Sequence, residues 1–124
     1  MRAPAAPRPW FASQYRHDPF VPAFQLVLQF RGASIEDRDE LLGVEDALFE
    51  MLEDGEELAG HEIGTGARNI FIATDDPDAT FRRLMPFLER ARLLVALTVA
   101  ARPVNEERYR ILWPPDHRAG FSLT

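Results

Sequence analysis

The sequence predicts an α+β fold in which two helices cover one face of an antiparallel sheet. Three features support this prediction: strict apolar alternation near residue 24, a helical apolar stripe that begins at Leu41, and a glycine-rich hairpin turn at residues 64–66. The chain has 124 residues, which is enough for one domain with a single core. We therefore expect one packed domain.

The first predicted strand covers residues 23–31, where one face is wholly apolar and the other is mostly polar but includes Val27, the pattern of a strand with one buried face. A helix is expected to follow, because Ser34 and Asp37 resemble a capping box and Gly55 suits a C-terminal stop. Its apolar stripe faces the sheet. The acidic residues of this region then fall on the outer surface of the helix.

Two strand-like runs, residues 58–64 and 67–74, are joined by Gly64-Thr65-Gly66. Glycines at these positions permit the tight turn of a hairpin. A three-residue loop would place Glu62 opposite Arg68. The sequence therefore predicts a hairpin in this register.

The second helix is expected to begin at Asp76 and Pro77 and to run to about residue 91. Asp76 can accept hydrogen bonds from free backbone amides, and proline suits the first helical position. Alternation then predicts two further strands, residues 93–101 and 108–113, which form the last hairpin.

This order of elements is that of the ferredoxin-like βαββαβ plait with an additional C-terminal strand. Residues 60–72, GHEIGTGARNIFI, run into Asp75-Asp76-Pro77 and resemble a small group of uncharacterised bacterial ferredoxin-like proteins. The resemblance implies the plait fold and carries no activity with it. We expect a flexible proline-rich arm at residues 1–22, the plait domain at residues 23–113 and a tail at residues 114–124.

The predicted core is one cluster formed by both helices and the sheet. Its members are Leu26, Leu28, Leu48, Phe71, Phe81, Leu84, Leu88, Val95 and Leu97.

The composition argues against several classes of site and partner. The chain has no cysteine, which excludes disulfides, thiolate catalysis and zinc sites built on sulfur. Its histidines, His17, His61 and His117, have no spacing that fixes metal ligands, so we expect no metal and no cofactor. No apolar run approaches the roughly 20 residues of a membrane span, and no secretory signal is evident. We therefore expect a cytoplasmic protein without membrane contact. All 14 basic residues are arginine, which favours a bacterial genome rich in G and C as the source.

Charge is distributed unevenly along the chain. The net charge of −6 disfavours nucleic-acid phosphate as a partner. Residues 36–62 contain twelve acidic residues and the single base Arg38. A solvated helix face is the usual explanation of such a run. The alternative is a surface for a basic protein partner, with Asp46, Glu50 and Glu53 as candidate contacts.

No residue is assigned a catalytic role. We expect His61 to be structural, because its neighbour Glu62 points to the opposite face of the strand and cannot act with it as an acid–base pair. In the alternative interpretation, His61, Glu62 and Arg68 line a polar pocket of a small enzyme or ligand-binding domain.

The sheet face away from the helices is expected to carry a small apolar row of Val27, Ala96 and Ala100. Such a row is typical of a surface that is buried against a second copy, which predicts a homodimer. The function that these features favour is a non-enzymatic, cytoplasmic protein-interaction or regulatory module. Its acidic helix face would bind a basic partner such as a toxin.

Overall fold

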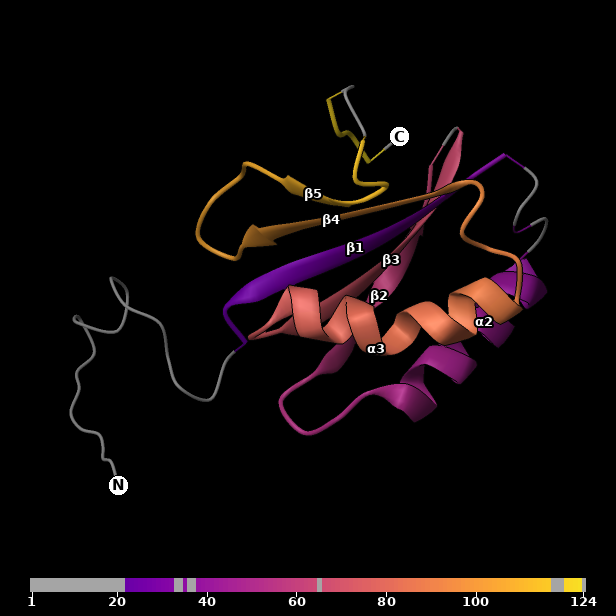
Figure 1. Ribbon diagram of the computed structural model, residues 1–124, viewed down its shortest axis with the longest axis horizontal. Helices are drawn as coiled ribbons and strands as arrows, with labels where there is room; N and C mark the ends of the chain where they lie inside the picture. The colour runs from indigo at the N-terminus through magenta and orange to yellow at the C-terminus, as the bar shows by residue number, and fades with distance from the viewer. Residues whose placement is uncertain (1–21, 33–34, 36–37, 65, 117–119, 124) are drawn as a thin grey trace.

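The computed structural model describes residues 22–32, 35, 38–64, 66–116 and 120–123, and these residues form the predicted plait (Figure 1). The elements are β1 (Phe24–Arg31), α2 (Arg38–Met51), β2 (Glu57–Ile63), β3 (Ala67–Thr74), α3 (Pro77–Arg90), β4 (Leu97–Pro103) and β5 (Arg110–Trp113). The strands form one antiparallel sheet in the order β2-β3-β1-β4-β5. The predicted α+β fold class, including the additional strand, is therefore confirmed.

Parts of the prediction lie outside the described residues. They are the capping box of Ser34 and Asp37, and the arm of residues 1–22 except Pro22. Asp76, in contrast, caps α3 as predicted: its carboxylate accepts a hydrogen bond of 3.1 Å from the Ala79 amide, and Pro77 occupies the first helical turn. This cap satisfies a backbone donor that the helix itself leaves without a partner.

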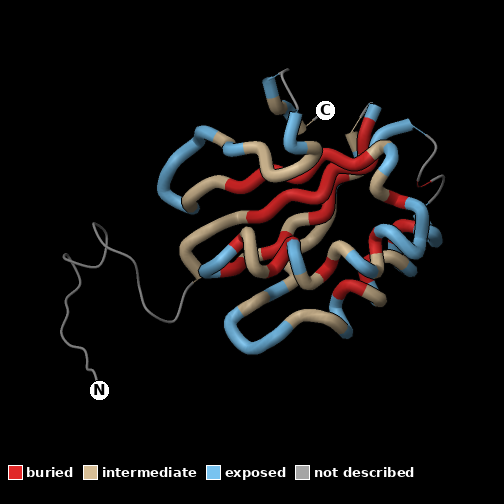
Figure 2. The backbone as a smooth tube through the Cα atoms, viewed as in Figure 1, coloured by how far each residue is buried: buried red, intermediate tan, exposed pale blue. Residues whose placement is uncertain are grey.

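The helices α2 and α3 lie on one face of the sheet, and the C-terminal segment lies on the other (Figure 1). Buried residues concentrate along the central strands and on the helix surfaces that face them (Figure 2). Leu26, Leu28 and Phe30 of β1 meet Leu48 of α2 and Leu84 of α3 in one apolar cluster. The periodicities of two and 3.6 residues place these side chains on the facing surfaces.

Two predicted core residues lie elsewhere. Phe71 is half-buried and pairs with Val27 on the sheet face away from the helices, while Ile70 and Ile72 are fully buried in the core. Apolar residues occupy both faces of β3, so the alternation of its sequence does not show which face turns toward the helices. Val95 is 95% exposed, because the chain turns after α3 and β4 begins only at Leu97.

The β2–β3 hairpin differs from its predicted register by one residue. Glu62 pairs with Asn69 and not with Arg68, because Ile63 pairs with Arg68 where the prediction paired it with Ala67, and the Gly64 amide donates to the Ala67 carbonyl at 2.8 Å. A shift of one residue moves each side chain to the opposite face of the sheet. The shift turns His61 toward the helices, where it pairs with Ile70.

Leu48 provides a test of the core. Leu48→Ala should lower the free energy of unfolding by about 2–5 kcal/mol, because the side chain is fully buried between α2 and the sheet. Val95→Ala is the matched control and should change it by less than about 0.5 kcal/mol. Urea denaturation followed by circular dichroism measures both. A Leu48→Ala midpoint equal to that of the parent would contradict this helix facing.

Gly43 lies inside α2, exposed to solvent, and no atom lies within 4 Å of the position that a Cβ would take. Gly43→Ala should therefore raise the free energy of unfolding by roughly 0.5–1 kcal/mol, because alanine loses less backbone entropy in a helix. The same urea titration measures this gain. A loss of stability would mean that the added methyl group meets an obstacle.

Candidate functional site

The predicted pocket residues His61, Glu62 and Arg68 do not face one common site. His61 lies on the helix side of the sheet, and Arg68 shares this side because it pairs with the core residue Phe30. Glu62 is exposed and points to the opposite side, as its pairing with Asn69 requires.

His61 instead pairs with Glu45 of α2, whose carboxylate the sequence analysis did not single out. The distance from His61 Nδ1 to Glu45 Oε1 is 2.9 Å, and the Glu45 side chain is 8% exposed. Glu45 falls four residues after Leu41 and three before Leu48, both buried, so helical spacing alone places it on the buried stripe. This spacing is the signal that could have identified it. The pair connects α2 to β2 and leaves the imidazole about one quarter exposed.

A second polar cluster joins α3 to the segment between α2 and β2. The Arg83 guanidinium donates to both Glu56 carboxylate oxygens, at 2.8 and 2.5 Å, and its Nε lies 3.1 Å from Glu53. Thr80 also donates to Glu56, at 2.6 Å. A bidentate contact of this kind fixes geometry as well as charge. The cluster therefore holds the C-terminal end of α2 against α3.

The pKa values of this cluster reflect the contact. Burial raises the pKa of Glu56, but hydrogen bonds from Arg83 and Thr80 and from the Glu53 amide bring it below its usual value. The hydrogen bond to Glu56 likewise raises the pKa of Arg83. Both groups are therefore held in their charged forms.

One hollow of about 400 Å³ lies beside this cluster, at the C-terminal end of α2. It is lined by Phe49, Glu50, Leu52, Glu53, Asp54, Glu56, Glu57 and Leu58. Two of these residues, Glu50 and Glu53, are candidate contacts of the predicted acidic surface. Asp46, the third, is exposed one turn before Glu50 on α2.

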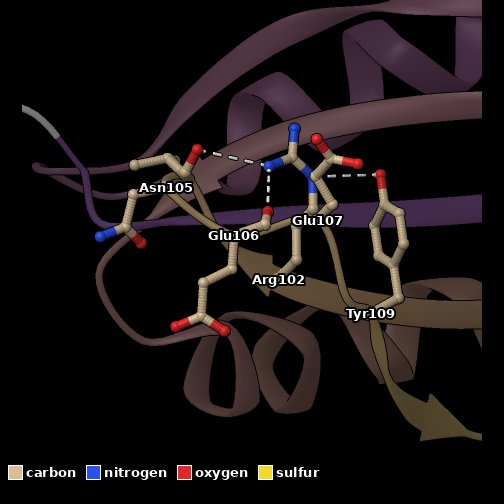
Figure 3. A pocket seen from close by; sticks show the side chains of 6 residues that line it. Arg102, Asn105, Glu106, Glu107 and Tyr109 are labelled. Atoms are coloured by element: carbon tan, nitrogen blue, oxygen red, sulfur yellow. Dashed lines mark hydrogen bonds between the residues drawn. The ribbon is translucent and has the colours of Figure 1, made fainter.

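Another hollow, of about 520 Å³, lies at the loop between β4 and β5 (Figure 3). Arg102 points into it, but its donors are engaged within the chain. They contact the Glu106 carbonyl at 2.7 Å, the Gln25 side chain at 2.8 Å and the Tyr109 hydroxyl at 3.4 Å. Arg102 therefore stabilises the conformation of this loop. His61 lines neither of the two hollows.

The predicted apolar row on the sheet is not at the surface. Val27 and Ala100 are both 0% exposed, and Ala96 lies in the turn before β4. The C-terminal segment lies against this side of the sheet, where Gln29 and Asn69 contact its backbone, and the Phe121 ring packs at a tilt against Tyr109 with ring centroids 4.8 Å apart. The position of this cover could not be predicted, because a short tail without periodicity gives no signal of where it packs.

No protein-family model matches the chain, and no curated protein sequence or solved structure matches it significantly. Among the described helices, none has the length and apolar character needed to cross a bilayer. In the same residues, no group of three or more histidine, aspartate or glutamate side chains is arranged to hold a metal ion.

Glu56 predicts a pH dependence of stability. Its pKa is lower in the folded state than in the unfolded chain, so its contribution is present near neutral pH and is lost as pH falls through the folded-state pKa. Glu56→Gln should cost about 1–3 kcal/mol at pH 7, and the difference from the parent should shrink below about pH 4. Urea denaturation across this range measures it.

Glu106→Gln, at an exposed loop position, is the matched control and should leave stability nearly unchanged at every pH. Asp78, whose pKa is also lowered through its hydrogen bond with Arg110, is present in all three proteins and cancels in the comparison. A pH-independent difference between Glu56→Gln and the parent would contradict the assignment.

Proposed function

We propose that this chain is a non-enzymatic protein-interaction module that binds a basic, amphipathic segment on the exposed side of α2. The residues of this outer α2 surface are Asp39, Leu42, Asp46, Phe49 and Glu50. The observation that carries the proposal is the exposure of Phe49, at 63%, and of Leu42, at 37%, within an acidic helix.

The two exposed apolar residues share one side of α2. Leu42, Asp46 and Phe49 are spaced by four and three residues, so they form a continuous row along the helix. Moving a phenylalanine side chain out of water is favourable by about 1.5–3 kcal/mol. Phe49 gains little of this free energy within the chain, and a partner that covers it would supply the rest. Exposed apolar residues rimmed by charge are typical of a docking surface.

The hollow beside Phe49 extends this surface and favours arginine as the incoming residue. Leu52 and Leu58 provide apolar lining, while Glu50, Asp54 and Glu57 are exposed carboxylates. The stem of an arginine packs against apolar lining, its guanidinium stacks on an aromatic ring, and its fork of donors matches carboxylates. A basic toxin would be one partner with this chemistry.

The expected cellular setting and self-association of the chain also remain proposals. The resemblance to uncharacterised bacterial ferredoxin-like proteins and the cytoplasmic setting are consistent with a small interaction module. A homodimer formed through Val27 and Ala100 would first require the C-terminal segment to leave the sheet. An enzymatic role near His61 has less support, because His61 lines neither of the two hollows described above.

A designed peptide tests the proposed surface. The probe is a helical peptide of about 14 residues with leucine and arginine on one side, labelled for fluorescence anisotropy. We expect it to bind the parent, and Phe49→Ala to weaken binding at least about tenfold, as loss of a buried aromatic contact does. Val95→Ala, which removes an exposed apolar side chain elsewhere, should leave affinity unchanged.

Charge variants complete this test. The pair Asp46→Asn and Glu50→Gln should weaken binding and reduce its salt dependence between about 0.05 and 0.5 M salt. The matched pair Glu106→Gln and Glu107→Gln removes the same charge from the β4–β5 loop. Equal losses in the two double variants, or full binding by Phe49→Ala, would overturn the proposal.

A further inference from the structure

We infer that the sheet face formed by β1 and β3 is a groove for a peptide chain, and that residues 120–123 occupy it as an internal ligand. Gln29 of β1 and Asn69 of β3 are cross-strand partners, and both are 0% exposed. The Gln29 amide donates to the Ser122 carbonyl at 2.6 Å, and the Asn69 amide donates to the Leu123 carbonyl at 2.5 Å. Two buried side chains thus contact two successive main-chain carbonyls.

The orientation of both amides is fixed by the sheet itself. Arg31 Nη2 donates to Gln29 Oε1 at 2.8 Å, and a guanidinium can only donate. The Gln29 amide nitrogen must therefore point away from Arg31, where it also donates to Asn69 Oδ1 at 3.1 Å. That contact in turn directs the Asn69 amide nitrogen toward the tail. The groove thus presents two aligned donors to any main chain that lies across it.

An aromatic position completes the groove. Phe121 packs on Tyr109, and the Arg102 guanidinium lies 5.7 Å from the centre of the Tyr109 ring. The preferred ligand is therefore a segment with an aromatic residue followed, two positions later, by an aliphatic one. Carbonyl contacts supply affinity for any main chain, and the side chains supply selectivity.

The contacts of the tail are those of an exchangeable ligand. Phe121 and Leu123 are only half-buried, and Gly120 and Ser122 are exposed, so few apolar contacts hold the segment. Water can satisfy the two amides when the tail leaves, which offsets part of the free-energy cost of release. This groove lies on the opposite side of the sheet from α2, so the inference is independent of the proposed function.

The test adds a free peptide to the full chain. The probe is fluorescein-labelled Gly-Phe-Ser-Leu-Thr, the sequence of residues 120–124, and affinity is measured by fluorescence anisotropy. The parent should bind it weakly, because its own tail competes at an effective concentration on the order of millimolar. Phe121→Ala weakens this competitor and should bind the probe at least about tenfold more tightly. The control peptide Gly-Ala-Ser-Leu-Thr should bind at least about tenfold more weakly than the probe.

Asn69→Asp tests the carbonyl contact in the Phe121→Ala background. It keeps the size of the side chain and its acceptor for Gln29, but it places an oxygen opposite the peptide carbonyl, so probe binding should be lost. Asn105→Asp, at an exposed loop position, adds the same charge and should leave binding unchanged.

Equal affinity of the parent and Phe121→Ala, or unchanged binding by Asn69→Asp, would overturn the inference. If circular dichroism shows Phe121→Ala to be unfolded, Leu123→Ala provides the same comparison. Unfolding of both variants would identify the tail as an integral part of the core, and the inference would be wrong.

Discussion

The burial of β1 on both faces is the constraint on which the rest of the structure depends. β1 lies between β3 and β4, and its five residues from Leu26 to Phe30 are all buried. Leu26 and Leu28 face the helices, while Val27 and Gln29 face the C-terminal segment. A central strand of this kind needs cover on both sides. The helices provide one cover, and residues 120–123 contribute to the other.

The two covers differ in chemistry. The helix side is an apolar cluster whose stability depends on close packing. The opposite side contains directed polar contacts, from Arg31 through Gln29 to Asn69. Packing specifies the fold, whereas polar contacts of fixed direction select what can lie against them. The candidate peptide groove therefore belongs to the less apolar face of the same strand.

Local patterns predicted most of the fold and little of the candidate sites. Alternation identified β1, and the Asp76 cap identified the start of α3, because each signal is contained in a few neighbouring residues. The Glu45–His61 pair and the tail across Asn69 depend on contacts between distant segments. A shift of one residue in the pairing of β2 with β3 was sufficient to place Glu62 opposite Asn69 instead of Arg68. Register and docking are tertiary properties that local spacing constrains only weakly.

The bulge in β2 has a consequence for how the molecule behaves at high concentration. β2 forms one edge of the sheet within the described residues, and its ladder is interrupted between Leu58 and Gly60, where Gly60 has a φ of +118°. An irregular edge is a poor template for the strand of another molecule, and β5 at the other edge has only four residues. Both edges thus disfavour fibre-like association, which directs encounters between molecules to side-chain surfaces.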